Sequence, residues 1–160
     1  MDNLQFYLNN REVIKGLALN TGTSVAPTFT GMCTTSEVSL TTNFEKQDVF
    51  VFCDAIKRSI ITGVALALEC TVKIDMNNLA IQKTLGNIHT LIKEGSVAQF
   101  NNQLVQFELI ESVNEGILTY KKYQVPVNLE FSDLGGAAED VGEYSLVINI
   151  IGKGQEVSAA

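Results

Sequence analysis

The longest regular pattern in the chain covers residues 59–75, where large apolar side chains alternate with small or polar ones. The first set of alternate positions is almost entirely apolar: Ile60, Thr62, Val64, Leu66, Leu68, Cys70, Val72 and Ile74. The second set is smaller or more polar: Ile61, Gly63, Ala65, Ala67, Glu69, Thr71 and Lys73. A period of two residues predicts a β-strand with one buried face. At about 3.3 Å per residue the strand spans roughly 50 Å, which favours a large sheet that neighbouring copies help to build.

Two short strands are expected near the N-terminus. Residues 6–8 and residues 13–19 each have a strand-like composition, and Asn9 and Asn10 lie between them. Asparagine tolerates positive φ better than most residues, so the pair suits a two-residue turn. We therefore predict a hairpin here.

Residues 20–35 differ in composition from the segments around them. Threonine, serine and glycine dominate, Pro27 interrupts regular structure, and Phe29 and Met32 are the large side chains. Such a polar segment is typical of a loop, and its isolated apolar side chains favour docking on another surface. We interpret this segment as a loop or arm.

Two further strands are expected before the long one. Val38 and Leu40 alternate with polar residues, which predicts a half-buried strand. Residues 49–53 are an uninterrupted apolar run, so we expect a strand covered on both faces. Residues 54–58 then form the connection to the long strand.

After Asp75 the period changes to spacings of three and four residues, which predicts an amphipathic helix. Its apolar positions are Leu79, Ile81, Leu85, Ile88, Leu91 and Ile92. Asp75, Asn77 or Asn78 is available to cap its start. Gly95 follows its end. Gly86 costs up to about 1 kcal/mol relative to alanine inside a helix, which suggests a close packing contact there.

The rest of the chain returns to strand patterns. Residues 104–110 and 117–125 flank a turn at residues 114–116, which predicts a hairpin. Residues 125–131 also alternate, and Pro126 lacks an amide donor, so that strand should start there or lie at an edge.

An acidic surface loop is expected over residues 133–143, followed by a strand over residues 144–151 and a flexible polar tail over residues 152–160. The total is about eight strands and one helix. We predict a single domain over residues 1–160, mainly β, with a β-sandwich or barrel and one packed α-helix.

The composition suits a subunit of an assembly. Charged residues make up 18% of the 160 residues, against a usual fraction of about 25%. The net charge of −7 argues against attraction to nucleic acid or to an anionic membrane. The same net charge is compatible with a surface along which DNA slides without adhering. The sequence has neither a signal-peptide pattern nor an apolar stretch long enough to span a membrane.

Residue types that could take part in catalysis or bind a metal ion are few and scattered along the chain. Cys33, Cys53 and Cys70 are widely spaced, and Cys53 and Cys70 lie in apolar stretches. We therefore interpret the cysteines as buried free thiols, in preference to a disulfide, in a protein that folds in a reducing cytoplasm. His89 is the only histidine and lies within the predicted helix. Three acids at positions 139, 140 and 143 fit a solvated loop better than a Ca²⁺ site. We expect no enzyme activity, no cofactor and no metal site.

Four stretches of the sequence carry a resemblance to a known family. They are residues 38–63, residues 74–78 leading into the helix, residues 95–102 and residues 134–138. These stretches resemble the major tail tube proteins of long-tailed (siphovirus-type) bacteriophages. The order of elements agrees: N-terminal strands, a long loop, a β-sandwich and one packed helix.

The resemblance implies a structural virion protein that self-assembles into hexameric rings. The inner sheets of the subunits would join into one barrel, and stacked rings would form the tail tube through which phage DNA is ejected. The implied partners are further copies of the chain, the tape-measure protein, the tail terminator and tail-tip proteins, and DNA in transient, non-specific passage, with no membrane. The implied location is the virion tail, after assembly in the host bacterial cytoplasm.

The resemblance also assigns roles to particular residues. Residues 59–75 would belong to the ring-closing sheet, and residues 21–35 would form an inter-ring arm. The arm candidates are Thr21, Pro27, Phe29 and Met32. The channel-lining candidates, on the polar faces of strands, are Glu69, Glu108 and Glu130. Acids in the lining would repel DNA phosphates.

Two alternatives stay open. The inner tube protein of a contractile tail or contractile injection system shares the fold, and a sheath gene beside this one would identify it. A monomeric ligand-binding β-barrel is a different class. It requires a cavity and a stable monomer, and the long strands of low charge argue against it.

Overall fold

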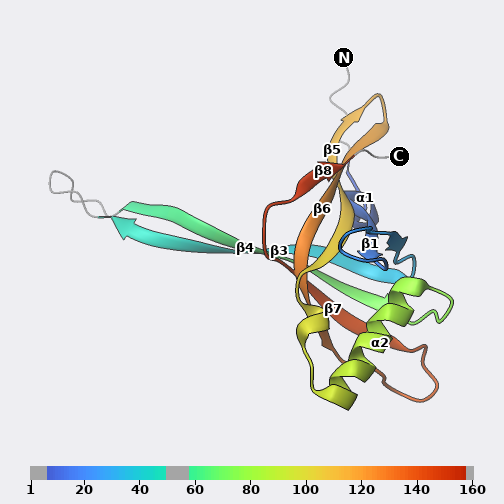
Figure 1. The fold of residues 1–160 in the computed structure, drawn as a ribbon. Coiled ribbons are helices and arrows are strands. Elements are labelled where there is room, and N and C mark those ends of the chain that lie inside the picture. The colour runs from blue at the N-terminus through green and yellow to red at the C-terminus, as the bar shows by residue number, and fades with distance from the viewer. Residues whose placement is uncertain (1–6, 50–57, 158–160) are drawn as a thin grey trace.

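The computed structural model describes residues 7–49 and 58–157, and that part of the chain is mainly antiparallel β-sheet (Figure 1). The strands are β1 (Ile14–Asn20), β2 (Phe29–Gly31), β3 (Thr35–Val49), β4 (Arg58–Lys73), β5 (Gln103–Asn114), β6 (Ile117–Ser132), β7 (Glu143–Ile150) and β8 (Gln155–Val157). The helical elements are α1 (Asn10–Val13), α2 (Leu79–Glu94) and the 3₁₀ turn η1 (Ala98–Phe100). The predicted fold class, mainly β with one packed helix, is confirmed.

All eight strands belong to one sheet, in the order β2-β1-β5-β6-β7-β4-β3, with β8 added to β6. The long strand β6 joins the two halves of this sheet. One edge of β6 pairs with β5, while its other edge pairs first with β8, at residues 122–124, and then with β7, from Val127 onward. Because β6 is shared, the β1–β5 half and the β7–β4 half enclose one core.

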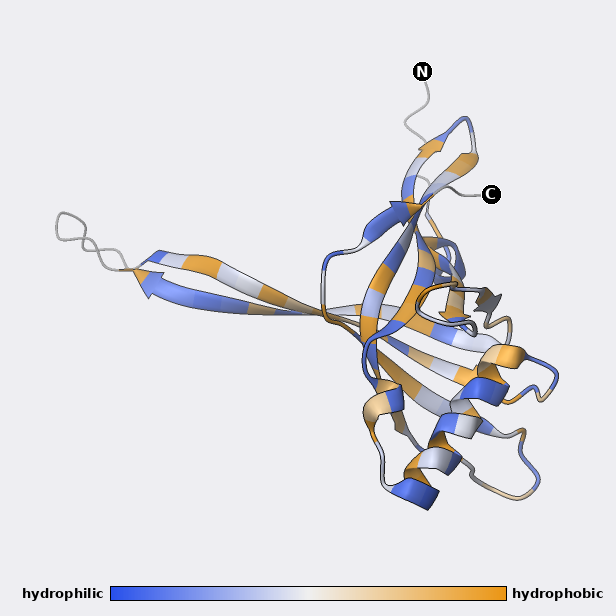
Figure 2. Ribbon diagram, in the orientation of Figure 1, coloured by the Kyte–Doolittle hydropathy of each residue, from blue (hydrophilic) through white to orange (hydrophobic). Residues whose placement is uncertain are grey.

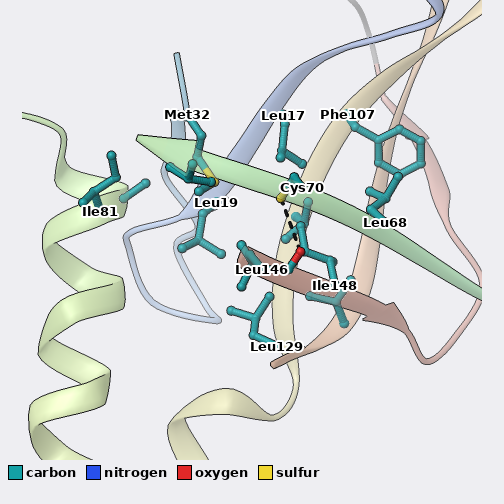
Figure 3. Packing of buried hydrophobic residues seen from close by; sticks show 14 of the residues in the cluster. Leu17, Leu19, Met32, Leu68, Cys70, Ile81, Phe107, Leu129, Leu146 and Ile148 are labelled. Carbon is teal, nitrogen blue, oxygen red and sulfur yellow. Dashed lines mark hydrogen bonds between the residues drawn. The ribbon is translucent and has the colours of Figure 1, made fainter. Parts of the chain in front are cut away.

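The core lies between these halves and is closed at one side by α2 (Figure 3). Its fully buried side chains come from several elements and include Leu19, Leu68, Val105, Leu146 and Ile148, with Ile81 from the helix. Fully burying such a side chain stabilises the fold by roughly 1.5–3 kcal/mol. The thiol of Cys70 is buried among them and donates to the carbonyl oxygen of Leu146, with a sulfur–oxygen distance of 3.6 Å.

Strands β3 and β4 continue beyond the rest of the sheet, which with α2 we call the body, as a two-stranded ribbon (Figure 1). We define this ribbon as residues 42–49 and 58–65. β4 pairs with β7 only from Leu66 to Lys73, whereas its pairing with β3 continues to Arg58. Among the described residues, β3 pairs with no strand except β4. The predicted long strand is therefore confirmed, and half of its length lies outside the body.

A β-bulge in the ribbon changes the predicted faces of β4. Glu45 pairs with Gly63, and the next residue, Lys46, pairs with Ile61, so Thr62 is an extra residue on β4. The hydroxyl of Thr62 donates to the Glu45 carbonyl oxygen at 3.3 Å. Beyond the bulge, Ile61 shares the face of Val64 and Ile60 lies on the opposite face. The predicted alternation is correct from Gly63 onward and wrong before it.

The hairpin predicted at the N-terminus is also wrong in its first half. Residues 7–9 form no strand, and Asn10–Val13 is a single helical turn. Asn9 precedes this turn, and its backbone N–H donates to the Glu12 carboxylate at 3.0 Å. A carboxylate three residues after the cap stabilises a helix start rather than a two-residue turn. The second predicted strand is present as β1.

Strand β3 contains the predicted half-buried strand around Val38 and Leu40, and both of these side chains are half-buried. It continues to Val49, the first residue of the predicted apolar strand. Residues 50–57, which hold the rest of the predicted apolar strand and most of its connection to β4, lie outside the described residues.

The predicted hairpin between β5 and β6 is confirmed. Glu115 and Gly116 both have positive φ, at 53° and 79°, as a tight two-residue turn requires.

The predicted strand start at Pro126 is wrong, because β6 continues through it. Pro126 lies where β6 changes its partner from β8 to β7, so the missing N–H costs no ladder hydrogen bond along that edge.

The predicted helix is confirmed as α2, and Asn78 is the residue that caps it. The Asn78 side-chain oxygen accepts from the Ala80 N–H at 2.8 Å, and Gly95 ends the helix with a φ of 68°. The close contact expected at Gly86 is wrong. A Cβ at that position would meet nothing within 4 Å.

Candidate assembly surfaces

The outward face of β3, β4, β7 and β6 brings two of the predicted channel residues together. Glu69 on β4 and Glu130 on β6 both pair with Val147, which lies on β7 between them. The two carboxylates therefore lie in one row across the sheet, two strand spacings or roughly 10 Å apart. Both side chains are exposed.

The neighbouring rows of this face carry small or polar side chains, and we call the whole surface the acidic face. Its other residues are Glu37, Ser39, Thr41, Ala67, Thr71, Ser132, Asn128, Ser145 and Asn149. Lys73 lies at the end of the face and forms an ion pair with Glu143, with a nitrogen–oxygen distance of 2.5 Å. The arrangement provides a weakly negative surface with few apolar groups.

Glu108, the third predicted channel residue, lies elsewhere. It is on β5, where its direct neighbours across the sheet are Lys15 and Lys122. The Lys15 ammonium lies 3.9 Å from the centre of the Tyr120 ring. Two lysines beside one glutamate leave no excess of negative charge around Glu108. Glu108 is therefore not part of the acidic face, which lies on other strands and rows of the sheet.

The predicted arm is folded onto its own body. The side-chain oxygen of Asn20 accepts from the N–H groups of Gly22 and Thr28, at 2.9 and 3.0 Å. The Asn20 carbonyl oxygen accepts from the Lys83 ammonium of α2 at 2.6 Å. Partial burial lowers the pKa of Lys83. Residues 21–28 are thus a compact loop, which we call the β1–β2 loop.

The four predicted arm residues have different environments. Met32 is buried in the core, and Phe29 lies in β2, where it pairs with Asn20. The Thr21 hydroxyl lies 2.9 Å from the Thr30 hydroxyl. Only Pro27 is on the exposed tip of the loop.

A cavity of about 770 Å³ lies at the seam between β1 and β3, where the sheet does not close. Leu17, Val38 and Leu146 provide apolar walls, while Arg11 and Glu37 lie among its polar lining. Cys70 also lines it, but burial raises the pKa of its thiol to about 12. A thiol that stays protonated is a poor nucleophile.

The described residues provide no metal centre and no membrane span. Within residues 7–49 and 58–157, His, Cys, Asp and Glu side chains nowhere gather in threes that could bind a metal ion. In the same part of the chain, no helix has the length and apolar character needed to cross a membrane.

No protein-family model matches the chain, and no curated protein matches its sequence. Solved structures do match its fold. A chain in the virion of a native gene transfer agent particle aligns with a TM-score of 0.58 and 13% sequence identity, covering 95% of this chain and 100% of the other. A chain in the tail of an empty gene transfer agent particle, described with C6 symmetry, aligns with a TM-score of 0.53 and 10% identity at the same coverage.

The chain has a tail-tube-like fold. The likeness extends over nearly the full length of both chains, so it includes the helix and both halves of the sheet. Identities this low show the fold alone, so the function has to be argued from the surfaces of the chain.

Proposed function

We propose that this chain is a structural subunit of a phage-type tail, which assembles into hexameric rings that stack into a tube for DNA ejection. The observation that carries the proposal is the tail-tube-like fold combined with a long strand, β3, whose outer edge has no strand partner among the described residues. An unpaired strand edge presents backbone donors and acceptors that pair readily with another chain. The C6 symmetry described for the gene transfer agent tail supports six copies in a ring.

The acidic face supports an assignment of the channel. Glu69 and Glu130 lie in one row of a surface that is otherwise small and polar. Six copies would repeat this row around the ring, and a negative wall repels phosphates and lets DNA pass without adhering. We therefore assign the channel side to the acidic face and exclude Glu108 from it.

The β1–β2 loop supports the inter-ring contact in a modified form. Met32, Phe29 and Thr21 fasten the loop to the body, while Pro27 remains on its exposed tip. In this proposal the tip, rather than a mobile arm, contacts the adjacent ring.

The further partners in this proposal are the tape-measure, terminator and tail-tip proteins. The protein assembles in the host cytoplasm, and its final location is the virion tail. A non-contractile tail is the first assignment and a contractile tube the alternative.

Negative-stain electron microscopy over a concentration series, with mass measured in parallel, tests the proposal. We expect hollow rings of six copies at low concentration and stacked tubes at high concentration. A monomer that persists throughout the series, also when purified tail-tip complex is added as an initiator, would contradict it.

The seam cavity favours a second function, the binding of a small molecule by a monomer. Its volume is within the range of ligand sites, roughly 300–1,000 Å³. Native mass spectrometry of the freshly purified protein distinguishes a tube subunit from a monomeric ligand-binding protein. A monomer with a constant added mass supports ligand binding, whereas bare multiples of six support the tube.

A further inference from the structure

The single helical turn α1 lies across the seam that holds the cavity. It is next to β1 and β5 on one side of the seam and next to β3 on the other. Asn10 and Arg11 of this turn supply part of the cavity lining. The turn is mostly polar, whereas β1, which follows it, is mostly apolar (Figure 2). α1 is therefore a polar cover on a cavity with apolar walls.

The turn is held to the body by few buried contacts. None of its four side chains is fully buried, and a helix of this length is not stable in water by itself. Its backbone becomes extended at Ile14, with a φ of −128°, where β1 begins to pair with β5. Segments with little buried surface open at a low cost in free energy. The junction of α1 and β1 is thus suited to act as a hinge.

Tyr120 on β6 fastens the turn in its closed position. Its hydroxyl donates to the backbone carbonyl oxygen of Glu12, with an oxygen–oxygen distance of 2.6 Å. The Lys15 ammonium lies 3.9 Å from the centre of the ring and helps to keep the ring in place. Desolvation, together with the carboxylates of Glu12 and Glu108, raises the pKa of Tyr120. The hydroxyl therefore stays protonated and continues to donate.

The lining of the cavity indicates the class of ligand. Its apolar walls include Leu17, Val38 and Leu146. Among the described residues, its charged lining consists of two cations and two carboxylates: Arg11, Lys15, Glu37 and Glu69. These four charges sum to zero, so the lining as a whole favours neither an anion nor a cation. The walls reward the burial of apolar surface, which favours an uncharged ligand.

We infer that the seam cavity binds an uncharged, mainly apolar small molecule and that α1 is the lid that admits it, with the Tyr120 hydroxyl as the latch. The inference rests on the second proposed function, ligand binding at the seam, and is independent of the tube. It adds the class of the ligand and the element that controls its entry.

A neutral dye and two matched variants test the lid on the full chain. The dye is N-phenyl-1-naphthylamine, which is apolar and fluoresces more strongly away from water. The test variant is Tyr120→Phe, which removes the hydroxyl and keeps the ring beside Lys15. The control is Tyr123→Phe, which removes a hydroxyl from the other face of the same strand, where the ring packs near Phe107. Thermal unfolding followed by circular dichroism checks that both variants fold.

Stopped-flow fluorescence measures how fast the dye enters and leaves. Because a closed lid slows both steps, Tyr120→Phe should raise the association and dissociation rates about two- to tenfold, the equivalent of one hydrogen bond. The dissociation constant should change less than the rates, and the control should behave like the wild type. Unchanged rates in folded Tyr120→Phe would overturn the lid and leave ligand binding at the seam standing.

A second pair of variants locates the dye. Val38→Phe adds volume at a cavity wall and keeps a residue that favours strands, while Val64→Phe makes the same change on the ribbon. We expect Val38→Phe to weaken dye binding at least about tenfold, because the ring occupies part of the site. Equal affinities in these two variants would overturn the inference.

The native mass spectrum separates this failure from that of the proposed function. A wild-type protein that binds no dye but carries a constant added mass would overturn the ligand class alone. Absence of both would overturn the inference and the second proposed function together.

The buried thiol behind the lid gives a readout that needs no ligand. Cys70 lines the cavity and is buried, and Cys33→Ser with Cys53→Ser leaves it as the only thiol of the chain. Its reaction with the neutral reagent 4,4′-dithiodipyridine should accelerate in Tyr120→Phe by the same factor as dye entry, without a matching loss of stability. Equal reaction rates with and without the Tyr120 hydroxyl would overturn the lid.

Discussion

Single residues in the core link burial to pH dependence. Burial raises the pKa of the Cys70 thiol from 9.0 to about 12 and that of the Tyr144 hydroxyl from 10.0 to about 12. Both groups therefore keep their protons in the folded chain at a pH where the unfolded chain has lost them. When the unfolded state binds fewer protons, stability falls as the pH rises.

We expect the free energy of unfolding to decrease above pH 9 by about 1.4 kcal/mol per pH unit for Cys70, with Tyr144 adding to the slope above pH 10. Urea denaturation at a series of pH values measures it. In Cys70→Val the extra loss between pH 9 and pH 10 should disappear. Parallel curves for the two proteins would contradict the assignment.

The glutamates on the two halves of the sheet give a test of the channel face. In assembled tubes, a cysteine in Glu69→Cys or Glu130→Cys should react with a small maleimide but only slowly with a bulky one, because the lumen restricts access. The matched Glu108→Cys should react with both reagents. Labelling rates, corrected for the wild-type cysteines, measure the difference. Equal rates for the bulky reagent at positions 69 and 108 would place both on the same side of the wall.

At the scale of elements, α2 has one glycine within it, Gly86, and another, Gly95, directly after its end, and the two have opposite roles. Gly86 lies within the helix with free space around its missing Cβ, whereas Gly95 has a φ of 68° at the end. We expect Gly86→Ala to stabilise the subunit by up to about 1 kcal/mol and Gly95→Ala to destabilise it by about 1–2 kcal/mol. Chemical unfolding of both variants measures this, and a destabilised Gly86→Ala would indicate a contact that the subunit alone does not show.

The β1–β2 loop depends on one lysine from α2. Lys83→Met removes the hydrogen bond to the Asn20 carbonyl oxygen, and an acceptor left unpaired in a partly buried position costs about 1–3 kcal/mol. We expect faster amide exchange at Gly22 and Thr28, whose N–H groups donate to the Asn20 side chain. Lys93→Met, on the exposed last turn of the same helix, is the control. Unchanged exchange in Lys83→Met would show that the loop holds its shape without the helix.

Local signals in the sequence predicted the elements whose pattern is regular. Period two predicted β4 from Gly63 onward, and period 3.6 with Asn78 and Gly95 predicted α2. The short helix α1 could also have been predicted, because Asn9 and Glu12 have the spacing of a capping box. The bulge at Thr62 could not have been predicted, because Ile60 and Ile61 are equally apolar and either register places an isoleucine on each face.

The candidate site was predictable only in part, for a different reason. Glu69, Glu108 and Glu130 all occupy polar positions of alternating strands, so local pattern treats them alike. What separates them is the strand opposite: Val147 lies between the first and third, while Lys15 and Lys122 flank Glu108. Such pairings join residues far apart in sequence, and no local period contains them.

At the scale of the whole molecule, the proposed assembly must overcome the mutual repulsion of copies that each carry a charge of −7. Salt screens this repulsion, while apolar contacts between copies do not depend on charge. We expect the concentration for half-assembly to fall as ionic strength rises from about 0.02 to about 0.3 M. Light scattering over a salt series measures it. A rise with salt would mean that ion pairs between copies dominate the contact.

The way the ribbon joins the body also has a mechanical consequence. β4 runs without interruption from the ribbon into eight consecutive residue pairs with β7. The hydrogen bonds of an antiparallel ladder are perpendicular to the strands, so a pull along the ribbon loads the whole ladder in shear instead of opening it one bond at a time. In the proposed tube, a neighbouring copy bound to the ribbon would therefore transmit tension into the subunit through this ladder, and all of its hydrogen bonds would resist the pull together.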